Sequence, residues 1–273
     1  MKVTVLGSGS SGNSILVESD RTRLLIDAGF SGRDLERRLA AVGREPSSID
    51  ALFVTHEHGD HTQGIGIVAR RWGIPLYLGE RTRVVCGSLL TGTETIHHYG
   101  CADPVRIGDL RVEPFLTVHD AVDPFAVTVT EEASGEKLGI ATDLGRPTVA
   151  VRHALRDCDM LILEANHDEI MLRESAYPWS VKLRIGGSHG HLSNRAAAEL
   201  VAGIAHPGLA TVVLAHLSEQ ANDPGLAADV VGQRLERLRF AGTLLVARQP
   251  EPIEPIDVGA GRRRLAPAQL PLL

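Results

Sequence analysis

Residues 55–61, Thr-His-Glu-His-Gly-Asp-His, carry three imidazoles and the carboxylate of Asp60 within six positions. His56 and His58 are two residues apart, which directs both side chains to the same side of an extended chain. Asp60 and His61 follow a glycine, where the chain can turn. One metal ion could take the first histidine pair, and a second could take Asp60 and His61. Imidazole and carboxylate together suit Zn²⁺ or a similar divalent cation.

Three further candidate ligands stand directly after apolar runs that are typical of strands: His119, Asp143 and His216. Strand ends are rigid, and the loops beyond them can meet at one edge of a sheet. His119 could complete a trio with the first histidine pair, and His216 could do so with Asp60 and His61. Asp143 has two oxygens and could bridge the ions, which leaves room for a shared water.

The elements that must position these residues are successive strands followed by alternating strands and helices. A buried strand at 51–54 leads into the metal-binding segment. The other predicted strands lie at 3–6, 14–18, 23–27, 75–78, 93–98, 110–117, 125–130, 137–141, 160–163, 210–215 and 243–247. The predicted helices lie at 32–42, 63–72, 81–90, 147–155, 193–205 and 226–240. We expect one domain over residues 1–248 and a Pro-rich, flexible tail over 249–273.

Composition limits the class of protein. The 273 residues are 43% hydrophobic, which is enough for a substantial core. No apolar run is long enough to span a membrane, and the chain enters a strand pattern at residue 3 without a cleavable signal. Three widely spaced cysteines fit no disulfide framework, so we expect a reducing cytoplasm. The net charge of −6 gives no global attraction to nucleic acid.

From Gly7 to about Val246 the sequence resembles the metallo-β-lactamase superfamily. Asp27 matches the first motif of that superfamily, where its role is to brace the metal loop. The seven candidate ligands match the metal-ligand motifs in order: His56, His58, Asp60, His61, His119, Asp143 and His216. The resemblance implies an α/β fold, the αββα sandwich of two mixed sheets flanked by helices, with a dinuclear site at one edge.

Within the superfamily the chain resembles the YycJ (WalJ) group of bacterial metallohydrolases. The shared stretches are 6–13, 53–58, 164–168, 177–185, 190–194 and 214–218. The resemblance implies a 5′-to-3′ exonuclease that acts on double-stranded DNA and is connected to mismatch repair. Gly59 departs from the serine that is more frequent in the group, and His189 is an additional histidine without an assigned role.

The chemistry implied is phosphodiester hydrolysis by two divalent ions, Zn²⁺ or Mn²⁺, which clamp the phosphate and activate a water molecule. Asp60 is the predicted base, because it would contact both metal and water. His191 is the predicted acid for the leaving oxygen, by analogy with its counterpart in RNase Z. The alternative for His191 is a structural role beside Ser193, a predicted helix N-cap.

The predicted substrate contacts are Ser10, Ser11, Asn13, His167, Trp179, Lys182 and Arg184. The turn at 7–13 offers N–H groups and hydroxyls as an anion site, although it could be an ordinary hairpin turn. Trp179 with two nearby cations could combine stacking with phosphate pairing, although the indole could instead be buried. His167 is expected at the rim of the site.

Two other functions stay open. One is a phosphodiesterase of the same fold that acts on small molecules such as cyclic nucleotides, which needs a narrow pocket and no basic track. The other is a metal-stabilised regulatory protein, against which the complete ligand set argues. The sequence does not determine the oligomeric state.

Overall fold

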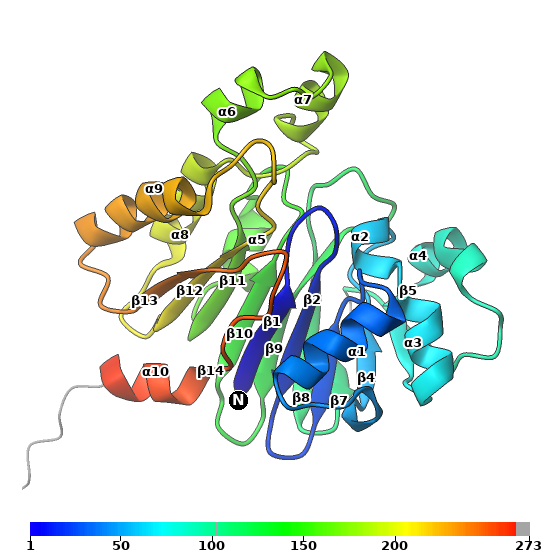
Figure 1. The fold of residues 1–273 in the computed structure, drawn as a ribbon. Coiled ribbons are helices and arrows are strands. Elements are labelled where there is room, and N and C mark those ends of the chain that lie inside the picture. Colours follow the sequence, from blue (N-terminus) through cyan, green and yellow to red (C-terminus); the bar gives the residue numbers. More distant parts are fainter. Residues whose placement is uncertain (102, 266–273) are drawn as a thin grey trace, which may run out of the picture.

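Two seven-stranded β-sheets face one another, and helices cover the outer surface of each (Figure 1). This arrangement is seen in a computed structural model that describes residues 1–101 and 103–265. The predicted sandwich of two mixed sheets flanked by helices is confirmed. The last part of the predicted tail, 266–273, lies outside the described residues.

Both sheets combine antiparallel and parallel pairing. The first has the order β14-β1-β2-β3-β4-β5-β6 and changes from antiparallel to parallel at β3. Its strands are β1 (Lys2–Gly7), β2 (Ser14–Glu18), β3 (Arg23–Ile26), β4 (Ala51–Phe53), β5 (Leu76–Gly79), β6 (Ile96–Tyr99) and β14 (Ile256–Asp257).

The second sheet has the order β7-β8-β9-β10-β11-β12-β13 and changes from antiparallel to parallel at β10. Its strands are β7 (Val105–Ile107), β8 (Leu110–Leu116), β9 (Phe125–Glu131), β10 (Lys137–Ala141), β11 (Met160–Glu164), β12 (Thr211–Ala215) and β13 (Thr243–Val246). The central parallel strands β4, β11 and β12 are buried along their whole length and are largely apolar because both of their faces are covered.

Helices α1 and α3 pack on the first sheet, and α5, α8 and α9 pack on the second (Figure 1). The helices are α1 (Gly32–Ala41), α2 (Gly59–Thr62), α3 (Ile65–Trp72), α4 (Glu80–Val85), α5 (Val149–Ala154), α6 (Glu169–Glu174), α7 (Trp179–Ile185), α8 (Asn194–Ile204), α9 (Pro224–Arg237) and α10 (Val258–Leu265), with short 3₁₀ turns at Pro46–Ser48 and Cys86–Leu89. The side chain of Ser193 accepts a hydrogen bond from the Ala196 N–H, which confirms the predicted N-cap of α8.

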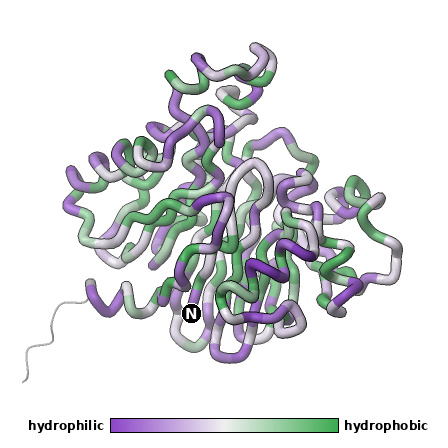
Figure 2. The backbone as a smooth tube through the Cα atoms, viewed as in Figure 1, coloured by the Kyte–Doolittle hydropathy of each residue, from purple (hydrophilic) through white to green (hydrophobic). Residues whose placement is uncertain are grey.

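Three apolar clusters hold the layers together. One fills the space between the sheets, and the other two lie between each sheet and its helices. Hydrophobic residues are therefore concentrated along the strands, and hydrophilic residues are frequent on the outward helices such as α1 (Figure 2). The packed interior holds the strand ends in fixed positions, and the candidate ligands follow directly after these ends.

The prediction of a flexible tail from residue 249 is wrong for the part that the structure describes. The Gln249 side chain donates a hydrogen bond to the Gly12 carbonyl at 2.8 Å, and the Ile253 N–H donates to the Val5 carbonyl at 3.0 Å. Strand β14 then pairs with β1, and Val258 is 1% exposed. Proline content suggested disorder, but the segment closes a sheet edge whose unpaired N–H and C=O groups need partners.

Helix α7 was not predicted from the sequence. None of its residues is buried, so it lacks the apolar stripe by which helical patterns are recognised. Together with α6 it forms an excursion between β11 and α8 that stands above the strand ends (Figure 1).

Candidate metal centre

All seven predicted ligands lie together at one edge of the sandwich. The first sheet supplies the loop after β4, which becomes the one-turn helix α2. The second sheet supplies His119 after β8, Asp143 after β10 and His216 after β12. Their donor atoms form overlapping groups in which the atoms of each group lie within 4.8 Å of one another.

The first group consists of three histidines. His58 Nδ1 is 3.2 Å from His56 Nε2 and 3.2 Å from His119 Nε2. Three ring nitrogens that converge in this way are the arrangement in which imidazoles share one cation. The histidine trio predicted for one ion is therefore brought together as a group that can hold a metal.

The second group combines Asp60, His61 and His216. His216 Nε2 is 3.1 Å from Asp60 Oδ2, and His61 Nε2 is 3.6 Å from the same oxygen. This mixed imidazole and carboxylate set also suits a divalent cation.

Asp143 lies between the two groups. Its Oδ1 is 3.6 Å from His119 Nε2 in the first group, and its Oδ2 is 3.1 Å from His61 Nε2 in the second. Oδ2 is nevertheless buried without a hydrogen-bond partner, because the approach of His61 does not have hydrogen-bond geometry. A buried carboxylate oxygen without a partner is costly unless a cation takes that place, so the residues present fit metal ions.

Hydrogen bonds fix the other side of the ligand rings. His61 Nδ1 is 2.7 Å from Asp27 Oδ2, and the same carboxylate accepts the N–H and hydroxyl of Thr55, each at 2.7 Å. His119 Nδ1 donates to the Gly190 carbonyl at 3.0 Å. Such partners select the tautomer that presents Nε2 to a metal. Asp27 thus contacts both His61 and Thr55 of the candidate metal-binding segment, and its bracing role stays a prediction.

Glu164, at the end of β11, lies at the site although no role was predicted for it from the sequence. It is fully buried, and its Oε1 accepts from His191 Nδ1 at 2.8 Å and lies 3.1 Å from His216 Nδ1. Its Oε2 accepts the backbone N–H groups of Leu144 and Leu192, each at 2.9 Å. The detectable signal was an acidic residue that ends an otherwise apolar strand.

Charge is distributed unequally between the two groups. Burial and the neighbouring imidazole of His61 hold the pKa of His56 well below its usual range. At His216 the opposite holds: burial is outweighed by the charge of Asp143 and by hydrogen bonds to Asp60 and Glu164, which raise its pKa to about 10. His56 is thus surrounded by other imidazoles, whereas His216 lies beside the carboxylates of Asp143, Asp60 and Glu164.

The backbone at the site is held in an unusual conformation. Asp27, Asp143 and His216 have φ angles of 61°, 58° and 55°, a left-handed region that non-glycine residues rarely adopt. Position 29 has no room for a side chain, because a Cβ on Gly29 would lie 1.7 Å from the Asp60 carbonyl oxygen. Strain of this kind persists where surrounding contacts fix the chain, as they do at functional sites.

A cavity of about 380 Å³ opens over the ligands. Three of the predicted site residues, Ser10, Arg184 and His191, line it, and so does Tyr177, which was not selected from the sequence. The Arg184 guanidinium pairs with Asp120, and this pair raises the pKa of Arg184. Burial lowers the pKa of His191, but the carboxylate of Glu164 outweighs it, so the net shift is upward.

The turn at 7–13 differs from the predicted anion site because its polar groups are used within the protein. Asn13 is 4% exposed, and its amide contacts Asp60 Oδ2 at 3.2 Å and the Gly9 carbonyl at 3.0 Å. The Ser11 N–H donates to the Gln249 side chain at 2.9 Å. Asn13 and Ser11 therefore brace the metal loop and the C-terminal segment.

Three other predicted contacts lie away from the cavity lining. His167 is 3% exposed, and its Nδ1 is buried without a partner. Lys182 Nζ donates to the Arg173 carbonyl at 2.6 Å. Trp179 is 67% exposed, but it lies on the face of α7 opposite to Val181 and Ile185, which line the cavity. The aromatic residue at the site is thus Tyr177.

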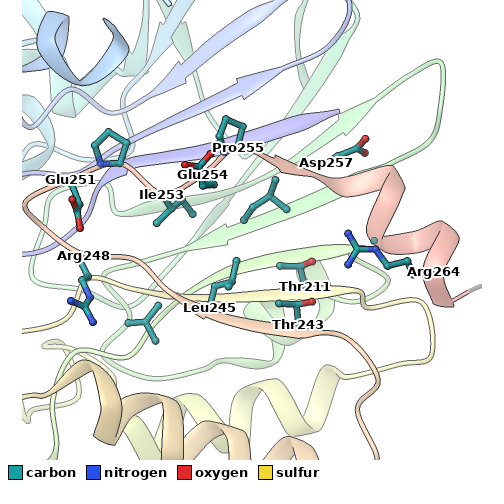
Figure 3. A pocket seen from close by; sticks show the side chains of 14 residues that line it. Thr211, Thr243, Leu245, Arg248, Glu251, Ile253, Glu254, Pro255, Asp257 and Arg264 are labelled. Carbon is teal, nitrogen blue, oxygen red and sulfur yellow. The ribbon is translucent and has the colours of Figure 1, made fainter. Parts of the chain in front are cut away.

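Another cavity, of about 650 Å³, lies apart from the candidate ligands. It lies at the open edge of the sandwich, where Ile253 and Pro255 of the C-terminal segment face Leu245 of β13 (Figure 3). None of the candidate ligands lines it. This cavity therefore lies between the C-terminal segment and β13.

The fold and the two ligand groups define a metal-dependent hydrolase. The family model "Beta-lactamase superfamily domain" matches residues 22–217, and the chain therefore belongs to the metallo-β-lactamase superfamily. A crystal structure of the metallo-β-lactamase fold protein YhfI from Bacillus subtilis is similar, with a TM-score of 0.70 and 19% identity over 92% of this chain and 98% of that one.

Two curated relatives are similar over most of their length. The exodeoxyribonuclease YycJ of Bacillus anthracis is 35% identical over 241 residues, which cover 87% of this chain and 90% of the relative. The exodeoxyribonuclease WalJ of Streptococcus pneumoniae serotype 2 is 35% identical over 230 residues, which cover 83% and 85%. The resemblance to the YycJ (WalJ) group is confirmed. Within the described residues, no helix has the length and hydrophobicity to cross a membrane.

Proposed function

We propose that the chain is a dinuclear metal-dependent phosphodiester hydrolase. The observation that carries this proposal is Asp143, whose carboxylate lies between the two ligand groups with one buried oxygen that has no hydrogen-bond partner. His56, His58 and His119 would hold one Zn²⁺ or Mn²⁺ ion. Asp60, His61 and His216 would hold the other. When bound, such ions neutralise phosphate charge and activate water.

The proposed substrate is DNA, degraded from the 5′ end. The two similar curated proteins are named exodeoxyribonucleases, and this supports a nuclease rather than a lactamase. Membership of their group also supports a role in DNA repair in the cytoplasm. The wholly buried free thiols of Cys86 and Cys158 are compatible with a reducing compartment.

Side chains of this chain would carry the proton transfers. Asp60 Oδ2 would accept a proton from the attacking water. His191, whose Nδ1 is bonded to Glu164, would donate a proton from Nε2 to the leaving oxygen. Arg184, on the cavity wall, would pair with a non-bridging oxygen of the phosphate, and Ser10 would contact the same group from the opposite loop.

The test is hydrolysis of 5′-labelled duplex DNA by the purified chain loaded with Zn²⁺ or Mn²⁺, with metal content measured in parallel. We expect about two ions per chain and release of nucleotides from the labelled end. Asp60→Ala should lower turnover by about 10²-fold or more, because it removes a ligand and the proposed base. The matched control is Asp20→Ala, at an exposed position in the β2–β3 turn.

The size of the cavity keeps a second candidate function open. A volume of about 380 Å³ lies near the lower end for ligand sites, and it would also suit a cyclic nucleotide. Cyclic nucleotides therefore belong in the same assay. Turnover of these without turnover of DNA would favour the small-molecule phosphodiesterase. Two bound ions with no turnover of either substrate would favour the metal-stabilised regulatory protein.

A further inference from the structure

The cavity above the metal centre has two chemically different walls. On one side lie metal ligands such as Asp60 and His216 together with His191. The other wall is formed by α7 and the segment before it, which supply the large hydrophobic lining residues Tyr177, Val181 and Ile185 together with the cation of Arg184. Hydrolysis of a phosphodiester needs only the first wall. The second wall is therefore available to a part of the substrate that is apolar.

The apolar wall is built by one face of α7. Val181 and Ile185 are four residues apart and so lie above one another on the helix, and Tyr177 stands directly before it. The helix is tied to the site, because the Ile185 carbonyl accepts the His191 N–H at 2.9 Å. Gly190 allows this contact, since a Cβ there would lie 2.0 Å from the Arg184 carbonyl oxygen. The wall thus has a fixed position relative to His191.

We infer that Tyr177 is a specificity-determining residue that receives the nucleobase adjoining the scissile phosphate. This inference rests on the proposed phosphodiesterase function. A half-buried phenol ring that lines the cavity offers stacking, and it makes no demand on base identity because every base has a π-face. Val181 and Ile185 line the same cavity and add apolar surface to it.

The volume of the cavity limits what can enter. About 380 Å³ is enough for one nucleotide and too little for a base pair with its neighbours. The base at the scissile bond must therefore unstack from its neighbours in the DNA. Stacking of this base on the Tyr177 ring offsets the free energy lost by unstacking. This predicts preference for a frayed or single-stranded end over a closed one.

The experiment compares the p-nitrophenyl esters of thymidine 5′-phosphate and of methyl phosphate, which share the leaving group and differ in carrying a nucleoside or a methyl group. In Tyr177→Ala, kcat/KM for the thymidine ester should fall about tenfold relative to that for the methyl ester. Tyr177→Phe should restore the ratio. Trp179→Ala, on the outer face of α7, should leave the ratio as in the wild type.

Binding gives a second readout on the metal-loaded protein by calorimetry. The Kd of thymidine 5′-monophosphate should rise about tenfold in Tyr177→Ala, and that of inorganic phosphate should change much less. If the wild type hydrolyses neither ester, the proposed function fails and these Kd values alone decide the inference. An equal loss for both ligands, an unchanged ratio, or the same effect in Trp179→Ala would overturn the role of Tyr177.

Discussion

One buried carboxylate connects the proposed acid with the metal centre. Glu164 contacts the Nδ1 atoms of His191 and His216, and three backbone N–H groups, including that of Asp143, surround it. Burial opposes its ionisation, but the charge of His191 and the hydrogen bonds from both imidazoles lower the pKa of Glu164 to about 2. It therefore remains charged and fixes both rings with Nε2 directed away from it.

This arrangement predicts how the loss of His191 depends on the leaving group. His191→Ala should lower kcat on DNA by about 10²- to 10⁴-fold, since the leaving alkoxide needs a proton. On a p-nitrophenyl ester the change should be below about tenfold, since p-nitrophenolate leaves without one. The measurement is kcat on both substrates, together with metal content by mass spectrometry.

His189 provides the control for His191. It is exposed and precedes His191 by two residues. Among the described residues, its ring forms a hydrogen bond only with the Ser188 hydroxyl. His189→Ala should therefore behave as the wild type. Loss of metal in His191→Ala, or an equal decrease on both substrates, would exclude the acid role and indicate a structural one.

At the residue scale, the residues that gather at the candidate site could be predicted from the sequence, whereas most of their hydrogen-bond partners, apart from Asp27, could not. The candidate ligands can be recognised because they are rare residue types at fixed spacing after apolar runs, as in residues 55–61. The roles of Asn13 and Trp179 depend on which way a side chain faces. Asn13 is turned inward onto Asp60, and Trp179 is turned outward from the cavity. Tertiary packing decides the direction in which a side chain faces, and the local sequence pattern does not indicate that direction.

At the scale of elements, strands with two covered faces were predictable and short exposed elements were not. Strand β12 is a continuous apolar run, whereas β7 and α7 have few buried residues. Loops between such elements are stabilised by single polar side chains. The connection from α4 to β6 depends on Glu94, which accepts the N–H groups of Thr91 and Gly92 and pairs with Arg70 of α3 at 2.5 Å.

Glu94 gives a prediction about pH. Burial raises the pKa of Glu94, but the hydrogen bonds from the Thr91 backbone and from Arg70 outweigh burial and lower the pKa from 4.5 to about 2. A lowered pKa contributes stability above pH 4.5, and this contribution is lost as the pH falls towards 2. Glu94→Gln should therefore lower Tm by a few degrees at pH 7, and the difference from the wild type should shrink below pH 4.5.

Thermal unfolding between pH 7 and pH 2.5 measures this difference. The matched control is Glu45→Gln, whose exposed carboxylate makes no ion pair among the described residues. A difference between Glu94→Gln and the wild type that stays constant with pH would show that the charge of Glu94 does not stabilise the loop.

At the scale of the whole molecule, both sheets repeat one pattern of three antiparallel pairs followed by three parallel pairs. In each sheet an aspartate in the left-handed conformation follows the fourth strand, Asp27 after β3 and Asp143 after β10. The metal centre lies where the two repeats meet. The first repeat is complete only because β14, from the far end of the chain, takes the place that β7 has in the second.

The C-terminal segment should therefore contribute to the stability of the whole fold. Val258, at the start of α10, is 1% exposed and packs in the cluster between the sheets. Val258→Ala removes two buried methyl groups and should lower the free energy of unfolding by roughly 1–2 kcal/mol. Val149→Ala is the matched control, because Val149 is 86% exposed and should change stability by less than about 0.5 kcal/mol. Chemical denaturation measures both, and equal stability of the two variants would show that the segment does not close the sheet in solution.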